Sequence, residues 1–230
     1  MRSSTGDRVD TWEMVVVHRA FRRTFRTAPA WIQSVAAGDR ERADFVAGHL
    51  AMIVEGLRHH HSGEDDMLWP VLLPRVTLHT ELVHRMEAQH KQLHVHIDRI
   101  NELLPGWRAT ADVVTGRELA GVFTEASALL DEHLAEEESQ ILPLVSEHVT
   151  HAEWTALGKR GQESIPRGKA GFVVLGELLE DASPQERTAF LAMIPAPVRL
   201  MWRLFGQGIY QRTRDRLYQG VPGPHPNGIA

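Results

Sequence analysis

The sequence predicts an all-α protein: an up-down-up-down four-helix bundle with a C-terminal helical extension. Apolar residues recur at spacings of three and four over long segments, while strand-like alternation is scarce. Gly- and Pro-containing breaks separate the periodic segments. Four amphipathic helices joined by connections of this size favour a bundle of antiparallel neighbours.

Length and composition set the expected organisation. Of the 230 residues, 43% are hydrophobic and 24% charged, which is typical of a globular protein. We expect a bundle over residues 1–150 and a helical extension over residues 151–230. The absence of cysteine excludes disulfides, thiolate metal ligands and cysteine nucleophiles.

Charge and hydropathy limit the classes of binding partner that the sequence allows. The formal net charge of −5 argues against nucleic acid as the main partner. No apolar run reaches the roughly 18 residues of a membrane span, so no membrane partner is expected. The start "MRSSTGDRVD" lacks the apolar core of a secretory signal, and a cytoplasmic location is the expectation.

The first expected helix carries a histidine within its apolar stripe. His18 shares this stripe with Met14, Val15, Phe21 and Phe25, while most of the nearby arginines lie elsewhere. Taken alone, His18 is more simply explained as a hydrogen-bonded core histidine than as a metal ligand. The stretch "TAPAWIQSVAAGDRER" is expected to separate this helix from the next.

The second helix is expected over residues 43–71 and ends before "LPRVTLHT". Ser62 and Gly63 weaken it by about 1 kcal/mol, but we expect the helix to continue through them. Its inward stripe contains Val46, Leu50, Ile53, Leu57, His60, Glu64 and Met67.

The third helix is expected over residues 79–104, with Pro105 and Gly106 as its stop. The fourth begins at "TGRE", where Thr115 caps the helix and Glu118 completes a capping box. The third stripe contains Val83, Met86, His90, Leu93 or His94, Ile97 and Leu104. The fourth contains Leu119, Phe123, Ala126, Leu130, His133, Glu137, Ile141 and Leu144.

An internal repeat singles out two of these stripes. "HHSGEDDMLWPVL" and "HLAEEESQILPLV" each contain a histidine, a glutamate four residues later, an acidic residue after it, and a proline ten residues after the histidine. Residues four apart share a helix face, so each copy directs one imidazole and one carboxylate inward. The second copy has Leu134 where His61 stands, which favours His60 as the ligand and places His61 beside the site.

Helix rise predicts that the polar positions share one layer. At 1.5 Å per residue, His60 and His90 both lie roughly 15 Å from the loop between their helices. Imidazoles and carboxylates without thiolate suit iron, manganese or zinc. Carboxylates on two helices can bridge two cations about 3.5 to 4 Å apart. The expected layer contains His18, His60, Glu64, His90, His133 and Glu137, with His94 one turn beyond His90.

These elements resemble the hemerythrin and HHE cation-binding family over about residues 10–150. The resemblance rests on "HRAFRR", on "EAQHKQLH", and on the two His-x-x-x-Glu copies followed by proline. It implies a non-heme centre of two iron ions, bridged by oxo or hydroxo and by two carboxylates, that binds dioxygen or a related molecule. The matching residues are His18, His60, Glu64, His90, His133 and Glu137, and His94 matches the His-x-x-x-His of the oxygen-carrying branch.

One position departs from that branch. The oxygen carriers have Asp five residues after the last histidine, whereas Glu137 follows His133 by four, as in the bacterial sensor-like branch. A ferritin-like oxidase needs Glu-x-x-His on two helices. Here the two such matches, Glu81 to His84 and Glu87 to His90, share one helix, which argues against that architecture.

The remaining polar residues are expected to lie outside the metal layer. Exposed or flanking positions are expected for His59, His61, His84 and His96. An outward face is expected for Asp65, Asp66, Glu136 and Glu138. His49, His79, His148 and His151 carry no sequence signal.

Residues 151–230 are expected to form helices packed on the bundle, with a protein-binding module as the alternative. "SPQE", from Ser183, is a helix start with proline at the first position. An amphipathic helix is expected to contain Val198, Met201, Trp202, Phe205, Ile209 and Tyr210. The tail "GVPGPHPNGIA" is expected to be mobile.

Three functions fit the sequence. The first is a di-iron protein that binds or responds to dioxygen, nitric oxide or peroxide. The second is a di-iron enzyme that decomposes peroxide. The third is a signalling module with a structural metal and a protein partner bound through residues 151–230. No sequence feature decides among them.

Overall fold

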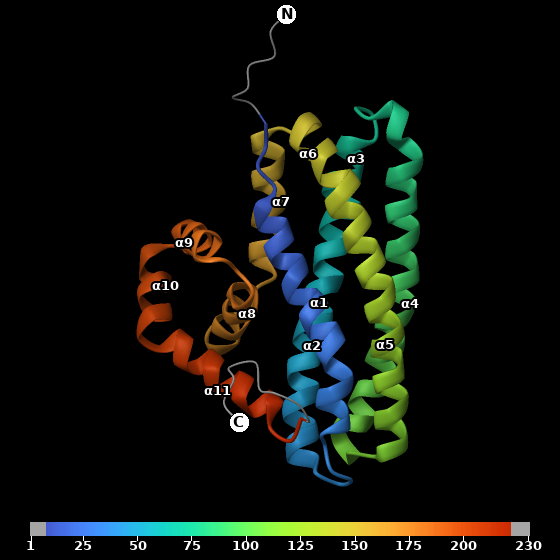
Figure 1. Ribbon diagram of the computed structural model, residues 1–230, viewed down its shortest axis with the longest axis vertical. Coiled ribbons are helices and arrows are strands. Elements are labelled where there is room, and N and C mark those ends of the chain that lie inside the picture. Colours follow the sequence, from blue (N-terminus) through green and yellow to red (C-terminus); the bar gives the residue numbers. More distant parts are fainter. Residues whose placement is uncertain (1–7, 222–230) are drawn as a thin grey trace, which may run out of the picture.

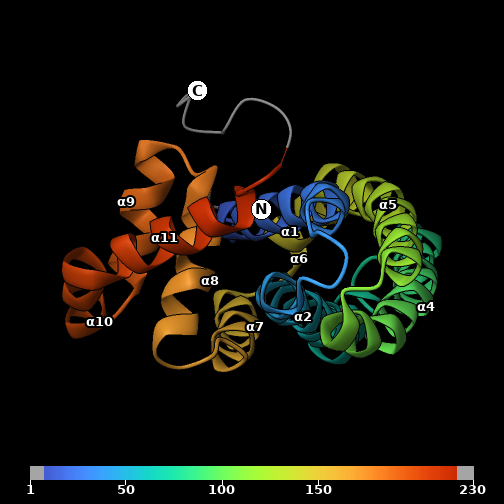
Figure 2. The ribbon, with the colours of Figure 1, turned by 90° about the horizontal axis from the view of Figure 1, so that it is seen from below.

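The computed structural model describes residues 8–221, and these form helices and no β-strand (Figure 1). The predicted all-α fold is therefore confirmed. Four long antiparallel helices make the bundle, which Figure 2 shows end on. They are α1 (Trp12–Gln33), α2 (Arg40–Gly63), α4 (Thr80–Thr110) and α5 (Val113–Glu136).

Two bundle helices continue through a widened turn. After α2 comes a π-helical turn, η1 (Glu64–Leu68), and then α3 (Trp69–Leu72). After α5 comes the π-helical turn η3 (Glu137–Ile141), and then α6 (Leu142–His148). The two turns occupy the same place in the two repeat copies, so the repeat is structural as well as sequential.

Proline explains why the turns widen at this point. Pro70 and Pro143 lie just after η1 and η3. In a regular α-helix, a proline ring clashes with the carbonyl four residues earlier and leaves that carbonyl without its donor. A π turn directly before the proline moves that carbonyl away. The expected continuity through Ser62 and Gly63 holds, and the irregularity lies one residue later.

The widened turns also keep both ends of each helix in phase with the core. His60, Glu64, Leu68 and Leu72 follow one another at intervals of four. A regular α-helix drifts by about 40° over each such interval, so a stripe of this kind would rotate out of the core. Yet Glu64, Leu68 and Leu72 are each at most 2% exposed. The other copy repeats this pattern in its buried positions His133, Glu137, Ile141 and Val145.

Two expected helix ends are wrong. The first helix runs through Pro29 to Gln33, because Trp31 and Ile32 are buried and anchor its last turn. The third helix runs through Pro105 to Thr110, and the buried Trp107 anchors that extension.

The start of the fourth helix also differs from the expectation. Asp112 caps α5, because its carboxylate accepts a hydrogen bond from the backbone N–H of Thr115 at 2.7 Å. Thr115 is therefore the third residue of the helix rather than its cap. Ala111 closes the preceding helix in the left-handed region, at φ 50°, which leaves a connection of only two residues.

The bundle core consists of two apolar clusters separated by a polar layer. One cluster includes Phe25, Leu50, Ile97 and Phe123, and the other lies around Trp69 at the α3 and α6 end. All four bundle helices pass from one cluster to the other through the expected metal layer. A polar layer between two apolar clusters is shielded from bulk water on both sides.

The C-terminal helices pack on the α1 and α2 side of the bundle, as Figures 1 and 2 show. α7 contacts α2, α8 and α9 contact α1, and α11 contacts α8. Ser183 caps α9 in a capping box, as expected from "SPQE". The segments are α7 (His151–Glu163), α8 (Lys169–Glu180), α9 (Pro184–Met193), α10 (Ala196–Met201), the π turn η4 (Trp202–Gly206) and α11 (Gln207–Tyr218).

A buried ion pair and a close helix contact attach this extension. Glu177 of α8 accepts a hydrogen bond from Arg23 of α1 at 2.6 Å, and its Oε1 atom lies 3.4 Å from Nε2 of the buried His49. Gly176 allows the ring of Tyr210 to lie directly against α8, since a Cβ there would overlap it.

The expected amphipathic stripe of residues 198–210 is only partly buried. Trp202 and Tyr210 are buried, but Met201 and Phe205 are exposed. A protein partner for this region stays a prediction, and residues 222–230 of the expected mobile tail lie outside the described residues. None of the helices in residues 8–221 is long and apolar enough to cross a membrane.

Candidate metal centre

The polar layer brings together six of the seven residues predicted as metal ligands. Each long helix contributes, directly or through the π turn that follows it. All are buried except for the side chain of His60, which is 11% exposed. The six residues are His18, His60, Glu64, His90, His133 and Glu137.

One group of possible ligands combines a histidine from α1 and one from α2 with the glutamates of the two π turns. Nε2 of His18 and Nε2 of His60 lie 3.2 Å apart. Oε1 of Glu64 lies 3.3 Å from Nε2 of His60, and Oε2 of Glu137 lies 3.5 Å from Nε2 of His18. One donor atom from each of these four residues falls within 4.8 Å of the others, which is close enough for one cation.

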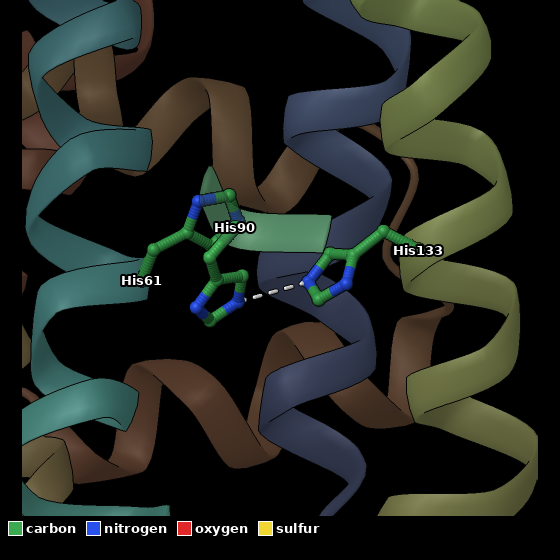
Figure 3. Close-up of side chains that lie close together, drawn as sticks. All are labelled: His61, His90 and His133. Atoms are coloured by element: carbon green, nitrogen blue, oxygen red, sulfur yellow. Dashed lines mark hydrogen bonds between the residues drawn. The ribbon is translucent and has the colours of Figure 1, made fainter. Parts of the chain in front are cut away.

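A second group consists of three histidines, His61, His90 and His133, shown in Figure 3. Nε2 of His90 lies 3.2 Å from Nε2 of His133. The ring of His61 stacks on that of His90, with centroids 4.1 Å apart and planes at 17°. All three side chains are buried.

The two glutamates link the groups. Oε2 of Glu64 lies 3.4 Å from Nε2 of His90, while its other oxygen faces His60. Oε2 of Glu137 lies 3.7 Å from Nε2 of His133 and 3.5 Å from that of His18. Each carboxylate therefore lies between one imidazole of the first group and one of the second.

Hydrogen bonds on the outer ring nitrogens orient three imidazoles. Nδ1 of His18 lies 3.0 Å from a carboxylate oxygen of Glu138, and Nδ1 of His90 lies 2.7 Å from one of Asp65. Nδ1 of His133 lies 2.9 Å from the amide oxygen of Gln89. All these oxygens are acceptors, so each Nδ1 donates and each neutral ring presents an Nε2 lone pair to the interior.

The spacing of these lone pairs fits a shared cation. With a cation bound, both rings are neutral and donate from Nδ1, so Nε2 of His90 and Nε2 of His133, 3.2 Å apart, cannot hydrogen-bond to each other. At a metal–nitrogen distance of about 2.1 Å, neighbouring ligands at right angles lie about 3.0 Å apart. Nε2 of His18 and Nε2 of His60 lie at the same 3.2 Å spacing.

The carboxylates supply an independent test of fit. None of the four side-chain oxygens of Glu64 and Glu137 makes a hydrogen bond within residues 8–221, and both residues are 0% exposed. Burial raises the pKa of Glu64, and burial together with the Glu64 charge raises that of Glu137 to about 8. An unpaired buried carboxylate is costly unless a cation compensates it, so the residues fit a metal site.

Burial and pairing move the histidine pKa values in opposite directions. Burial, and after it positive charge on His90, lower the pKa of His133 to about 2. Burial also disfavours the charged form of His90, but the hydrogen bond to Asp65 and the negative charge of the nearby Glu64 outweigh it and raise the pKa to about 9. Without a bound cation, His90 and Glu137 are therefore the groups of the layer that keep a proton most strongly.

His61 is the main difference from the sequence-based expectation. It was expected beside the site or exposed, but it is fully buried within the second group. Adjacent residues of a helix point about 100° apart, so His60 can face α1 while His61 faces α4 and α5. The repeat could not reveal this, because the second copy has only one histidine at these two positions.

His94 lies apart from both groups. Its ring centroid is 6.0 Å from that of His61, and its buried Nε2 atom makes no hydrogen bond within the described part of the chain. The structure therefore places His94 near His61 but in neither group of possible metal ligands among the described residues.

Three of the four acidic residues expected on an outward face have a role at the site instead. Asp65 and Glu138 bind the outer nitrogens of His90 and His18. Glu136 accepts a hydrogen bond from Gln89 at 2.9 Å, and Gln89 in turn binds His133. The acidic residue that follows the glutamate in both repeat copies is the sequence signal that could have identified Asp65 and Glu138.

Comparison with known proteins agrees with this site. A family model described as the hemerythrin HHE cation binding domain matches residues 10–145, which include every residue of both groups. No curated protein and no solved structure matches the chain.

Proposed function

Because the chain belongs to the hemerythrin HHE cation-binding family, we propose that its bundle holds two iron ions and binds a small ligand such as dioxygen, nitric oxide or peroxide. In this proposal His18 and His60 would hold one ion, and His61, His90 and His133 would hold the other. Glu64 and Glu137 would each contribute a carboxylate to both. The supporting observation is the pair of fully buried carboxylates that make no hydrogen bond within residues 8–221, each lying between imidazoles of both groups.

The donor set suits this role. Five imidazoles and two carboxylates without thiolate are typical of non-heme iron, and they leave manganese and zinc as chemically reasonable competitors. A bound iron pair supplies positive charge and redox chemistry toward a diatomic or peroxide ligand. The chain itself fixes the imidazole orientation through Asp65, Glu138 and Gln89. The apolar clusters on both sides limit access of water.

The proposal is tested by metal analysis and an optical spectrum of the purified chain. We expect two irons per chain and near-ultraviolet absorption from bridged iron. Glu64→Ala and Glu137→Ala should each reduce iron well below this level. The matched control is Asp66→Ala, since Asp66 is acidic, close to Glu64 in sequence and 64% exposed. One colourless zinc per chain, or full iron in both glutamate variants, contradicts the proposal.

Peroxide decomposition at the same centre is a second candidate. The observation that favours it is the 11% exposure of the His60 side chain, which gives the layer an edge that a small reactant can reach. Stopped-flow measurement of peroxide consumption separates turnover from simple binding. Multiple turnovers per iron pair support the enzyme, and one stoichiometric reaction supports a sensor or store.

A further inference from the structure

A cavity of about 480 Å³ lies between the bundle and the C-terminal extension. α1 and α2 form its bundle side, and α7, α8 and α9 close it from the extension. His60 and Glu64 belong to its lining, so the cavity reaches the metal layer. Its volume lies within the roughly 300 to 1,000 Å³ of small-molecule sites.

The lining is mainly apolar, and its charged members have partners. Val17 and Phe21 come from α1, Leu157 from α7 and Leu178 from α8. The charged lining residues outside the metal layer are paired as follows: Glu13 with the Trp154 indole, Glu55 with Arg58, Arg160 with Asp66 at 3.9 Å, and Glu177 with Arg23. A charged ligand would therefore lose its hydration without gaining a free counter-charge.

Two glycines of α2 face the walls of the cavity. Gly56 and Gly63 are seven residues apart and share a face. A Cβ at Gly56 would lie 3.7 Å from Phe21, and one at Gly63 would lie 3.4 Å from Leu157, so both walls lie at ordinary van der Waals distance from α2. On α7, a Cβ at Gly158 would meet no atom within 4 Å. A side chain at position 158 would therefore have open space in front of it within the cavity.

The cavity approaches the metal layer from one side only. The His60 side chain is 11% exposed, whereas those of His18 and His133 are 0% exposed. The ring of Phe21 lies beside that of His60, with centroids 5.4 Å apart. An occupant would thus meet the His18 and His60 group and not the three-histidine group.

We propose that this cavity binds an uncharged, mainly apolar small molecule, such as a medium-length alkyl or aromatic compound, with its inner end against His60. The inference deepens the proposed function, since it names a ligand class for the same metal centre. It also assigns a task to residues 151–193, which provide one wall of the site.

The test uses the iron-loaded full-length chain and N-phenyl-1-naphthylamine, an uncharged probe whose fluorescence rises in apolar surroundings. We expect saturable binding of about one probe per chain, displaced by 1-octanol far better than by octanoate. Saturating 1-octanol should also shift the optical spectrum of the azide-treated iron form, because its end lies against His60.

Cavity-filling variants locate the binding. Val17→Trp and Gly158→Trp should each weaken probe binding about tenfold or more, while iron content remains that of the parent. Gly158→Trp serves as the second variant because its Cβ has open space. Leu204→Trp is the control, since Leu204 is 61% exposed and lies outside the cavity.

The two proposals can fail separately. Absence of saturable probe binding on iron-loaded protein, or an equal loss in Leu204→Trp and Val17→Trp, overturns the apolar ligand site and leaves the iron centre standing. Preferred displacement by octanoate overturns it too. Saturable probe binding on a chain that holds no iron pair overturns the proposed function alone.

Discussion

Asp65 and Glu64 hold opposite edges of the same imidazole: Nδ1 of His90 lies 2.7 Å from Asp65, and its Nε2 lies 3.4 Å from Glu64. The two acidic residues of the second repeat copy lie at the two ring nitrogens of His18 in the same arrangement. Glu138 lies 3.0 Å from its Nδ1, and Glu137 lies 3.5 Å from its Nε2. Two consecutive acidic residues in each copy therefore orient a histidine from another helix.

This relationship predicts that Asp65→Asn weakens metal binding without removing a ligand. The amide keeps the shape of the side chain but loses the charge that fixes the His90 tautomer. We expect a loss of about 10- to 100-fold in metal affinity, measured by competition with a chelator. Asp66→Asn, at the exposed next position, should match the parent. Equal losses in the two variants would show that only the overall charge matters.

The position of His61 predicts that it matters more for metal binding than His94. His61→Ala removes a buried imidazole stacked on His90, whereas His94 belongs to neither group of possible ligands among the described residues. We expect His61→Ala to lose more iron per chain than His94→Ala, measured by elemental analysis of proteins purified side by side. The reverse order would restore the ligand assignment based on the sequence resemblance.

The ion pair between Glu177 and Arg23 predicts a large stability difference between single and double variants. Their side chains are 5% and 18% exposed. Glu177→Ala should reduce the free energy of unfolding by about 3 to 5 kcal/mol, because it leaves a mostly buried guanidinium with less compensation. Arg23→Met combined with Glu177→Leu should recover much of that loss. Denaturant unfolding of the metal-loaded proteins measures both, and additive losses would rule out the pairing argument.

The raised pKa values of Glu137 and His90, about 8 and about 9, predict a pH dependence for the metal-free protein. A raised folded-state pKa means that the folded state keeps a proton that the unfolded state has lost, so the stabilising contribution of these two groups is full below their unfolded pKa values and is lost as pH rises through about 8 and about 9. The lowered pKa of His133 has no effect above its unfolded value near 6.5. We therefore expect a lower melting temperature at pH 9 than at pH 7.

A variant assigns this effect to the layer. Glu137→Gln cannot ionise, so its melting temperature should fall less between pH 7 and pH 9 than that of the parent. An identical fall in both proteins would place the titrating groups elsewhere.

Helical periodicity was sufficient to predict the bundle and the polar layer. Period and rise are local properties, so the sequence alone could place His18, His60, His90 and His133 at one level. The matching family model confirms the family. Which of these residues bind metal stays a prediction.

Features that depend on neighbouring helices could not be predicted in this way. His61 is buried because α4 and α5 pack beside it, and Pro105 lies within a helix because Trp107 finds a place in the core. The cavity forms between segments far apart in the sequence, whose periodicity is weak. Tertiary packing decides each of these outcomes.

The π turns η1 and η3 limit how this chain can change during evolution. Each turn corrects the phase of its helix between the site carboxylate and the apolar residues beyond it. A deletion of one residue there would rotate the following segment by about 100° and leave only one of these two groups facing inward. Among natural variants of this chain, we therefore expect substitutions at the exposed Asp66, Ser139 and Gln140 to be common and changes of length within these turns to be absent.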